Sequence, residues 1–289
     1  MINELVDEIL DWTSQRMANP GKVWGLPWGF AKLDELTGGI HEGQMSVIGG
    51  RTGAGKSVLA MTTAMAVARH LIQHDLPGQV LIYSPEMRAR SLMMRYLQQR
   101  TGIPSDRVNR GELTPDEVEI WEGACEKLRA YEGRVVVEAQ SDLHIQDLIA
   151  DIEARALEDP NNPVRLVVVD YIQYVNGNGG NRYEQVTDVA QRLKLLNNRT
   201  GIPILAVAQI HKAAKDRNGK RQEDDPPTMD DISDSQYIAR VADNVIVLWR
   251  PEHKFGGRKA RIELAKARDG ATGSFWLAYD PETTRFYDE

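Results

Sequence analysis

The chain has 289 residues, of which 42% are hydrophobic and 27% charged, and its formal net charge is −7. This composition is that of a globular protein with one large domain or two small ones. It excludes a disulfide scaffold, because there is one cysteine, and no apolar run is long enough to cross a membrane. Without a signal peptide either, the sequence predicts a cytoplasmic protein with no membrane partner. Because the net charge is negative, a nucleic-acid partner would need a local basic patch.

The first predicted element is a helix over residues 2–17, where apolar residues recur at helical spacing. Pro20 and Gly21 then interrupt the chain. We therefore expect residues 1–23 to be a linker helix and linker ahead of a main domain at 24–289. Two placements of the helix are open: it packs on its own domain, or it packs on a neighbouring subunit.

From residue 44 onward, short apolar strands alternate with helical patterns. This alternation predicts an α/β fold with a mainly parallel central sheet and helices on both faces. The last three predicted strands follow one another without helices, so they should be antiparallel at one edge. The predicted strands are 44–50, 79–84, 134–139, 165–170, 203–209, 244–250, 258–267 and 273–280, and the predicted helices are 30–36, 56–73, 87–101, 114–130, 143–157 and 183–199.

The stretch "GGRTGAGKS" carries the phosphate-loop pattern between a predicted strand and a predicted helix. Its glycines let backbone N–H groups surround phosphate oxygens, and the helix N-terminus adds positive charge. Lys56 would reach the outer phosphates, while the Ser57 hydroxyl would bind Mg²⁺. The sequence thus predicts ATP and Mg²⁺ as cofactors, held by Gly50, Arg51, Thr52, Gly53, Ala54, Gly55, Lys56, Ser57 and Val58.

Three polar side chains follow the predicted parallel strands where ligands of such sheets bind. Asp170 suits the Mg²⁺ shell together with Ser57, Glu86 suits a general base for the attacking water, and Gln209 could sense the γ-phosphate. Each also has a plain alternative: Asp170 as a helix cap, Glu86 as a first-turn acid, and Gln209 as loop polarity.

The strand within "RIELAKARDGATG" raises a separate question about charge. Its alternation predicts Ile262 and Leu264 on one face, with Lys266 and Arg268 continuing on that face. Two cations on one face need an anionic partner. We expect no such partner within the same subunit, because Lys56 already pairs with the phosphates held by the phosphate loop.

Together these motifs resemble the RecA-type motor domain of DnaB-like replicative helicases. The matching stretches are "GLPWGFAKLDELTGGI", "GGRTGAGKS", "YSPEM", "VVVDYIQYV", "AVAQIHK" and "KARDGATG". The resemblance implies a hexameric ring that hydrolyses ATP between subunits and moves 5′ to 3′ on single-stranded DNA to unwind duplex DNA. It further implies that Glu86 is the catalytic glutamate, that Arg268 is an arginine finger with Lys266 as companion, and that Arg250 and Tyr279 lie at the nucleotide base. A tyrosine at the edge of the core is the open alternative for Tyr279.

The resemblance places DNA-gripping loops near residues 176–183 and 211–238. The second loop is polar and contains five cations that could follow DNA phosphates without sequence preference; a solvated charged loop is the alternative. These cations are Lys212, Lys215, Arg217, Lys220 and Arg221.

Two departures from the family pattern bear on partners. Residues 233–236 read Ser-Asp-Ser-Gln, without the arginine and glycine usual in the second DNA loop. The family's N-terminal domain, which meets primase, has no counterpart ahead of residues 2–17. We therefore expect a naturally short phage or mobile-element version or an excised motor, with a helicase loader or primase as further partners. The alternatives are a RecA-fold ATPase that does not unwind DNA and an accessory subunit; "KARDGATG" and "SPEM" favour the helicase.

Overall fold

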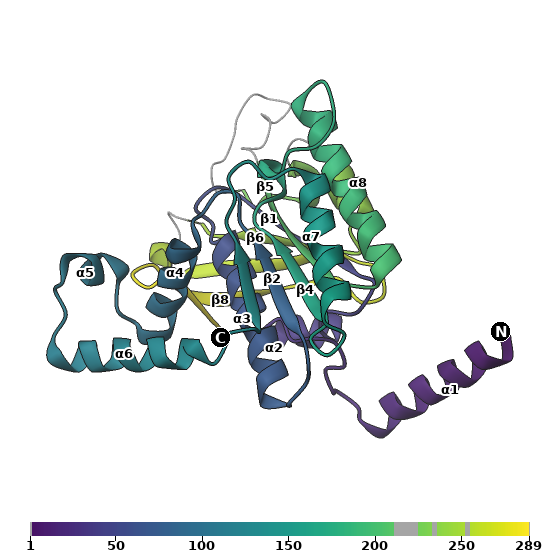
Figure 1. Cartoon of the computed structure of the whole chain (residues 1–289), viewed down its shortest axis with the longest axis horizontal. Helices are drawn as coiled ribbons and strands as arrows, with labels where there is room; N and C mark the ends of the chain where they lie inside the picture. The colour runs from purple at the N-terminus through teal and green to yellow at the C-terminus, as the bar shows by residue number, and fades with distance from the viewer. Residues whose placement is uncertain (1, 211–224, 233–235, 252–254, 289) are drawn as a thin grey trace.

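One twisted sheet organises the chain, and the computed structural model describes it within residues 2–210, 225–232, 236–251 and 255–288 (Figure 1). In the described residues its strand order is β3-β2-β4-β5-β1-β6-β7-β8-β9. The strands β1 to β6 pair in parallel, and β7 to β9 continue the sheet in antiparallel pairs. Their bounds are β1 Met45–Gly50, β2 Gln79–Tyr83, β3 Val135–Glu138, β4 Val164–Val169, β5 Ile204–Gln209, β6 Asn244–Trp249, β7 Lys259–Ala267, β8 Gly273–Asp280 and β9 Arg285–Asp288.

Helices cover both faces of the sheet, as the alternating pattern predicts. One core cluster packs α2, α3 and α4 on one face, and a second packs α7, α8 and α9 on the other. Because β1 and β5 are covered on both sides, nearly all their residues are buried, which explains their continuous apolar sequence. The helices are α2 Ala31–Thr37, α3 Lys56–Gln73, α4 Ala89–Thr101, α5 Ser105–Arg110, α6 Pro115–Arg129, α7 Ile145–Glu158, α8 Arg182–Thr200 and α9 Gln236–Val241.

The parallel strands all bring their carboxyl ends to one edge of the sheet. β1 pairs with β5 and β6, so Gly50 lies beside both Gln209 and Leu248. β4 is the next strand beyond β5 and ends at Val169, immediately before Asp170. The predicted site residues that follow strands are therefore gathered at one edge by the topology alone.

A bulge near the end of β7 overturns the predicted face of Lys266 and Arg268. Leu264 pairs with Ile246, but the next pair joins Lys266 to Val245, so one extra residue stands in β7. Val245 belongs to the core on the α8 side, whereas Leu264 belongs to the core on the α3 side. Lys266 consequently lies on the face opposite to Leu264, and Arg268 follows it there.

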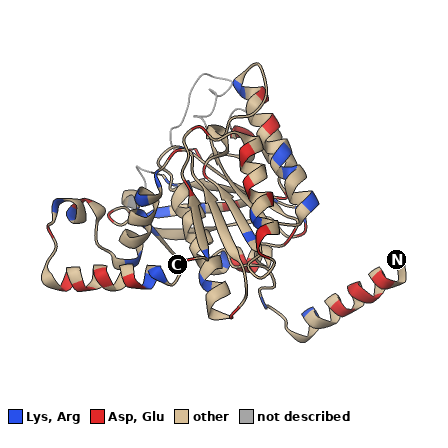
Figure 2. Ribbon diagram, viewed as in Figure 1, with Lys and Arg blue, Asp and Glu red and all other residues tan. Residues whose placement is uncertain are grey.

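Helix α1 (Ile2–Ala18) extends away from the sheet and buries none of its residues (Figure 1). Its apolar side chains stay exposed, including Ile2, Leu5, Ile9 and Leu10, each more than half exposed. Acidic residues occupy other positions of the same helix (Figure 2). In this structure the helix does not pack on its own domain, and its packing on a neighbouring subunit stays a prediction.

Short elements beyond the sequence prediction complete the fold. The helices α5 and α9 have six residues each, and β9 has four. In contrast, α6 begins where its sequence signals a start, because Thr114, directly before Pro115, forms a capping box with Glu117 in the first turn. Among the described residues, none of the helices combines the length and apolar character needed to span a bilayer.

Candidate nucleotide-binding site

The phosphate loop connects the end of β1 to the first residue of α3. Its backbone turns through Gly55, whose φ is 102°, and Lys56 opens the helix with its side chain buried. A Cβ at Gly55 would lie 2.6 Å from Phe286 Cζ, so the space on that side of the loop is filled by β9. The Lys56 Nζ donates to Arg51 O at 3.0 Å and thus spans the mouth of the loop. The loop has the curvature and the charge to hold phosphates.

Ser57 and Asp170 lie together at the base of this loop. The Ser57 Oγ donates to Asp170 Oδ1 at 3.1 Å, and Asp170 is only 3% exposed. Burial raises the pKa of the Asp170 carboxyl to about 6, and the nearby charge of Glu86 adds to the rise. A hydroxyl oxygen beside a buried carboxylate is the donor set that Mg²⁺ accepts, and the ion would supply the positive charge that Asp170 needs. These two residues fit a magnesium ion.

Glu86 follows β2 on the exposed side of the same edge. Its charge raises the pKa values of both Lys56 and Asp170, so it lies close enough to act on each. For Lys56, burial is the larger effect and lowers its pKa overall. An exposed carboxylate close to Lys56 and Asp170 can accept a proton from a water molecule.

Gln209 bridges β5 and the phosphate loop. Its Nε2 donates to Thr52 Oγ1 at 2.7 Å, so the amide contacts the loop directly. The buried Gln173 fixes the backbone of Gln209 from below, accepting from its N at 3.1 Å and donating to its O at 3.2 Å. Gln209 therefore joins the end of β5 to the phosphate loop.

Arg250 and Tyr279 meet beside the loop, and their place at the nucleotide base, which the resemblance implies, stays a prediction. The Arg250 Nη2 donates to Gly53 O at 2.6 Å, and its guanidinium lies 4.5 Å from the centre of the Tyr279 ring. Phe286 covers the same tyrosine at 4.9 Å between ring centres, leaving it 7% exposed. Arg250 therefore stands between the tyrosine and the loop.

Arg51 links the loop to the segment after residue 224. Its Nη2 donates to Asp225 O at 3.0 Å. The chain thus leaves the site through Gln209 and returns to it at Asp225. The five cations predicted to bind DNA, Lys212, Lys215, Arg217, Lys220 and Arg221, lie outside the described residues, as do residues 233–235 of the second predicted DNA loop.

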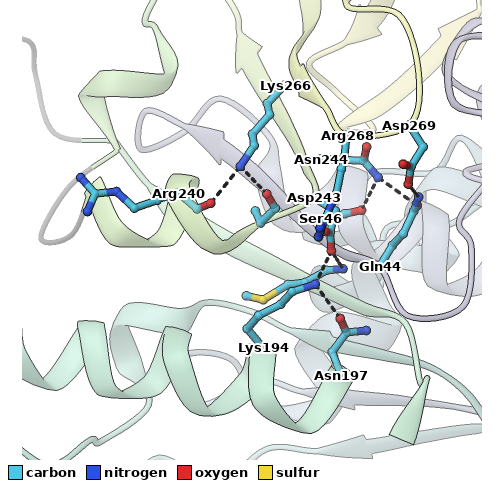
Figure 3. Close-up of polar contacts among 12 residues, drawn as sticks. Gln44, Ser46, Lys194, Asn197, Arg240, Asp243, Asn244, Lys266, Arg268 and Asp269 are labelled. Carbon is cyan, nitrogen blue, oxygen red and sulfur yellow. Dashed lines mark hydrogen bonds and ion pairs between the residues drawn. The ribbon is translucent and has the colours of Figure 1, made fainter. Parts of the chain in front are cut away.

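Arg268 and Lys266 are not part of this cluster; Ala267, between them, pairs with Asn244 at the amino end of β6, so they lie at the other edge of the sheet. Figure 3 shows their contacts there. The Arg268 Nη1 donates to Asp243 Oδ1 at 3.0 Å, and Asp243 also accepts from the N of Met45, the first residue of β1. Since the phosphate loop follows the last residue of β1, the length of that strand, roughly 16 Å at about 3.3 Å per residue, separates the two regions. The Arg268 side chain is 69% exposed and faces outward.

Both cations have partners within their own chain, contrary to the sequence expectation. Arg268 pairs with Asp243, and Lys266 Nζ donates to the carbonyls of Ala239, Arg240 and Ala242 at 3.1, 2.9 and 2.7 Å. These carbonyls end α9, where the helix presents partial negative charge.

Asp243 is the residue of this region that sequence reasoning missed. The sequence prediction considered the carboxyl ends of the strands, whereas Asp243 precedes the amino end of β6. Its signal in the sequence is one acid immediately before an apolar strand, in "ADNVIVLW". Phe286 was missed because β9 was missed.

The fold and the site together indicate the class of protein. The fold is that of a RecA-like P-loop ATPase: a parallel sheet with antiparallel edge strands, a buried phosphate-loop lysine, and a serine hydrogen-bonded to a buried aspartate. The family model for the DnaB-like helicase C-terminal domain matches residues 25–288. The chain therefore belongs to the DnaB-like helicase family, in the part that forms its C-terminal domain.

Individual relatives agree with this assignment. The replicative DNA helicase DnaB of Geobacillus stearothermophilus is 30% identical over 278 residues, covering 92% of this chain and 57% of the relative. This chain spans about three fifths of the length of such curated relatives. In fold it is similar to a solved ATPase domain, with a TM-score of 0.83, 20% identity and 98% of each chain covered. A DnaB-like replicative helicase, solved in a study of its interactions with primase, gives a TM-score of 0.82 at 20% identity, covering 98% of this chain and 66% of that one.

Proposed function

We propose that this chain is the ATP-driven motor of a replicative DNA helicase, with its ATP sites completed between subunits of a hexameric ring. The observation that carries the proposal is the separation of the two charged centres. The phosphate loop and Asp170 lie at one edge of the sheet, while Arg268 lies at the other edge, exposed. An arginine side chain cannot cover roughly 16 Å, so Arg268 can meet an ATP only on a neighbouring copy.

Within one subunit, the phosphate loop would hold the nucleotide. The backbone N–H groups of residues 50–58 surround the phosphates, and Lys56 exchanges its bond to Arg51 O for the outer phosphate oxygens. Ser57 and Asp170 would hold Mg²⁺, which would supply positive charge to neutralise the phosphates. Arg250 frames the loop at Gly53, and Tyr279 supports Arg250 on the side where the base would lie.

Glu86 and Gln209 act on the reaction from this cluster. Glu86 accepts the proton of the attacking water, for which an exposed carboxylate close to Lys56 and Asp170 is suited. Gln209 responds to the γ-phosphate because its amide already contacts Thr52, and it can exchange this bond when the phosphate leaves.

The neighbour supplies the remaining positive charge. Arg268, with Lys266 as its companion on the same strand end, reaches the γ-phosphate of an adjacent subunit as charge develops there. A finger arginine contributes on the order of 10³–10⁵ in rate. Turnover therefore depends on assembly, and α1, whose apolar residues are unburied, would join neighbouring subunits as the linker over residues 1–23. The motor domain then comprises residues 24–289.

The proposed substrate is single-stranded DNA threaded through the ring in the 5′ to 3′ direction. This part rests on family membership and on the five cations between residues 212 and 221, which would contact phosphates. The proposed location of the motor is the cytoplasm, and its proposed further partners are a helicase loader or primase.

Unwinding of a forked DNA with ATP and Mg²⁺, together with the mass of the assembly, tests the proposal. Lys56→Ala should abolish both turnover and unwinding, and retained turnover would place the ATP site elsewhere. A hexamer that hydrolyses ATP in response to DNA but does not unwind the fork would favour the accessory role over the helicase. A monomer without DNA-stimulated turnover would contradict the motor itself.

Mixing experiments test the shared site. Subunits with Arg268→Ala keep an intact phosphate loop, and subunits with Glu86→Ala keep an intact finger. If the site is shared, mixtures contain some interfaces with both parts, so mixing two inactive variants should restore part of the turnover. Absence of rescue at every ratio would contradict a shared site.

A further inference from the structure

A buried carboxylate, Asp243, joins four elements at the amino edge of the sheet (Figure 3). It precedes β6, and its Oδ2 accepts from Lys194 Nζ of α8 at 2.5 Å and from Met45 N of β1 at 2.8 Å. Its Oδ1 accepts from Arg268 Nη1 after β7 at 3.0 Å. Asp243 is 3% exposed and Lys194 is 13% exposed. The charge of this carboxylate is thus balanced inside the protein by Lys194.

Arg268 is held by Asp243 twice. Its backbone N donates to Asp243 O at 3.0 Å, and its side chain donates to the carboxylate of the same residue. The bond to the carboxylate uses Nη1, while the side chain as a whole is 69% exposed. A guanidinium carries five N–H donors in a rigid plane, so one can stay on Asp243 while others face outward.

The two carboxylate oxygens of Asp243 have different hydrogen-bond partners. Oδ2 accepts from the largely buried Lys194 and from Met45 N at the start of β1, which fixes the position of the carboxylate, and Lys194 also donates to Asn197 Oδ1 at 3.0 Å. Oδ1 is left for Arg268. The strand end is fixed independently by the three carbonyl bonds of Lys266. Both the base and the tip of Arg268 are therefore attached to rigid elements.

We propose that Asp243 is a positioning residue for the trans-acting arginine: it holds the Arg268 guanidinium extended and oriented toward the neighbouring subunit, with Lys194 as the buried counter-charge. This inference rests on the proposed role of Arg268. The side chain is 69% exposed, and a guanidinium that Asp243 already orders loses less conformational freedom when it meets the γ-phosphate. Asp243 itself touches no nucleotide.

The test must separate positioning from folding. Asp243→Asn alone leaves Lys194 buried without its counter-charge, which destabilises folded proteins. The informative variant is therefore Lys194→Met with Asp243→Asn, which removes both charges. Lys194→Met alone is the matched reference, because Arg268 then keeps its carboxylate. Both are assayed as assembled full chains for ATP turnover, with melting temperature and assembly mass recorded alongside.

Relative to the Lys194→Met reference, the double variant should lose on the order of tenfold or more in kcat, with KM for ATP changed less than about twofold. When Arg268 is also replaced by alanine, adding Asp243→Asn to Lys194→Met should cause no further loss of kcat. In mixtures with Glu86→Ala subunits, the double variant should regain turnover, because its own phosphate loop is intact. The inference would be overturned if the reference and the double variant had equal kcat. It would also be overturned if Asp243→Asn lowered kcat as much in the Arg268→Ala background as in its absence.

A separate variant decides the matter if the double variant does not fold. Arg268→Lys keeps the charge but lacks the planar fork that can bind a carboxylate and a phosphate together. It should turn over ATP little faster than Arg268→Ala, and near-normal turnover would overturn the positioning role. If Arg268→Ala itself hydrolyses ATP normally, the proposed finger fails, which is a different outcome from a failure of Asp243 alone.

Discussion

Replacing Asp170 by asparagine should stabilise the folded protein while ending catalysis. The Asp170 carboxyl is 3% exposed, and burial raises its pKa from 3.8 to about 6. Well below pH 3.8 the group is neutral in the folded and unfolded states alike and costs nothing. As the pH rises toward 6, the unfolded state loses the proton first, so the folded state becomes less stable. Above about pH 6 the penalty is complete and constant.

The size of this penalty follows from the shift. One pKa unit corresponds to about 1.36 kcal/mol, so a shift from 3.8 to about 6 costs the folded state about 3 kcal/mol. With an unfolding entropy of about 2.1 cal/mol/K per residue over 289 residues, removing this cost should raise the melting temperature by roughly 5 °C. The amide oxygen of the introduced asparagine can still accept from Ser57.

Asp243 provides the matched control, because it is equally buried and its pKa moves the other way. Burial alone would raise the pKa of Asp243, but the hydrogen bonds from Lys194, Met45 N and Arg268 lower it below the ordinary value. A carboxyl with a depressed pKa stabilises the folded state above its unfolded pKa, and this stability is lost as the pH falls. Asp243→Asn should therefore lower the melting temperature near pH 7.5, where Asp170→Asn raises it.

Melting curves from about pH 4 to about pH 8, without nucleotide and then with Mg²⁺ and ADP, make the measurement. Asp170→Asn should melt above the unmodified protein near pH 7.5 and only slightly above it near pH 4, where most of the penalty is absent. Mg²⁺ and ADP should stabilise the unmodified protein more than the variant, since the metal loses its carboxylate. A variant that melts lower near pH 7.5, or whose advantage does not depend on pH, would refute the account of Asp170 as a destabilised metal ligand.

Three further predictions concern the phosphate loop, the sensor and α1. Gly55→Ala places a Cβ 2.6 Å from Phe286 Cζ at a φ of 102°, which should lower the free energy of unfolding by about 1–3 kcal/mol and weaken ATP binding. The control is Gly43→Ala, at a φ of 72° with nothing within 4 Å, which shows the effect of backbone strain alone. Equal melting temperatures for the two variants would contradict the clash with Phe286. Gln209→Ala should lower kcat on the order of tenfold or more at saturating ATP with little change in melting temperature, and a change in KM alone would exclude a sensor role. Deleting residues 2–18 should reduce the number of subunits in the assembly, as its mass would show. The melting temperature of the domain should stay nearly unchanged, because α1 buries no residue. A ring with its full number of subunits would exclude the linker role.

Local chemistry made the nucleotide edge predictable. A phosphate loop is a contiguous pattern, and parallel strands bring their carboxyl ends together whatever their order in the sheet. Asp170, Gln209 and Glu86 could thus be grouped with Lys56 before any contact was known. Their contacts follow the prediction: Ser57 meets Asp170, and Gln209 meets the loop through Thr52. The catalytic roles of these residues stay proposals.

Register and pairing between distant segments could not be predicted in the same way. The bulge in β7 depends on how that strand matches β6, and it alone moves Lys266 and Arg268 to the face opposite Leu264. Asp243 is 49 positions from Lys194 and 198 from Met45, so no local pattern joins them. The short elements α5, α9 and β9 were missed because few residues carry too weak a periodicity.

The sequence by itself therefore determined the fold class and the chemistry of the phosphate edge, since both depend on neighbours along the chain and on strand periodicity. Only the tertiary structure decided where the second charged centre lies. It put Arg268 beyond the reach of its own phosphate loop and gave it a buried carboxylate as support, because strand register is fixed by packing between segments that are far apart in sequence.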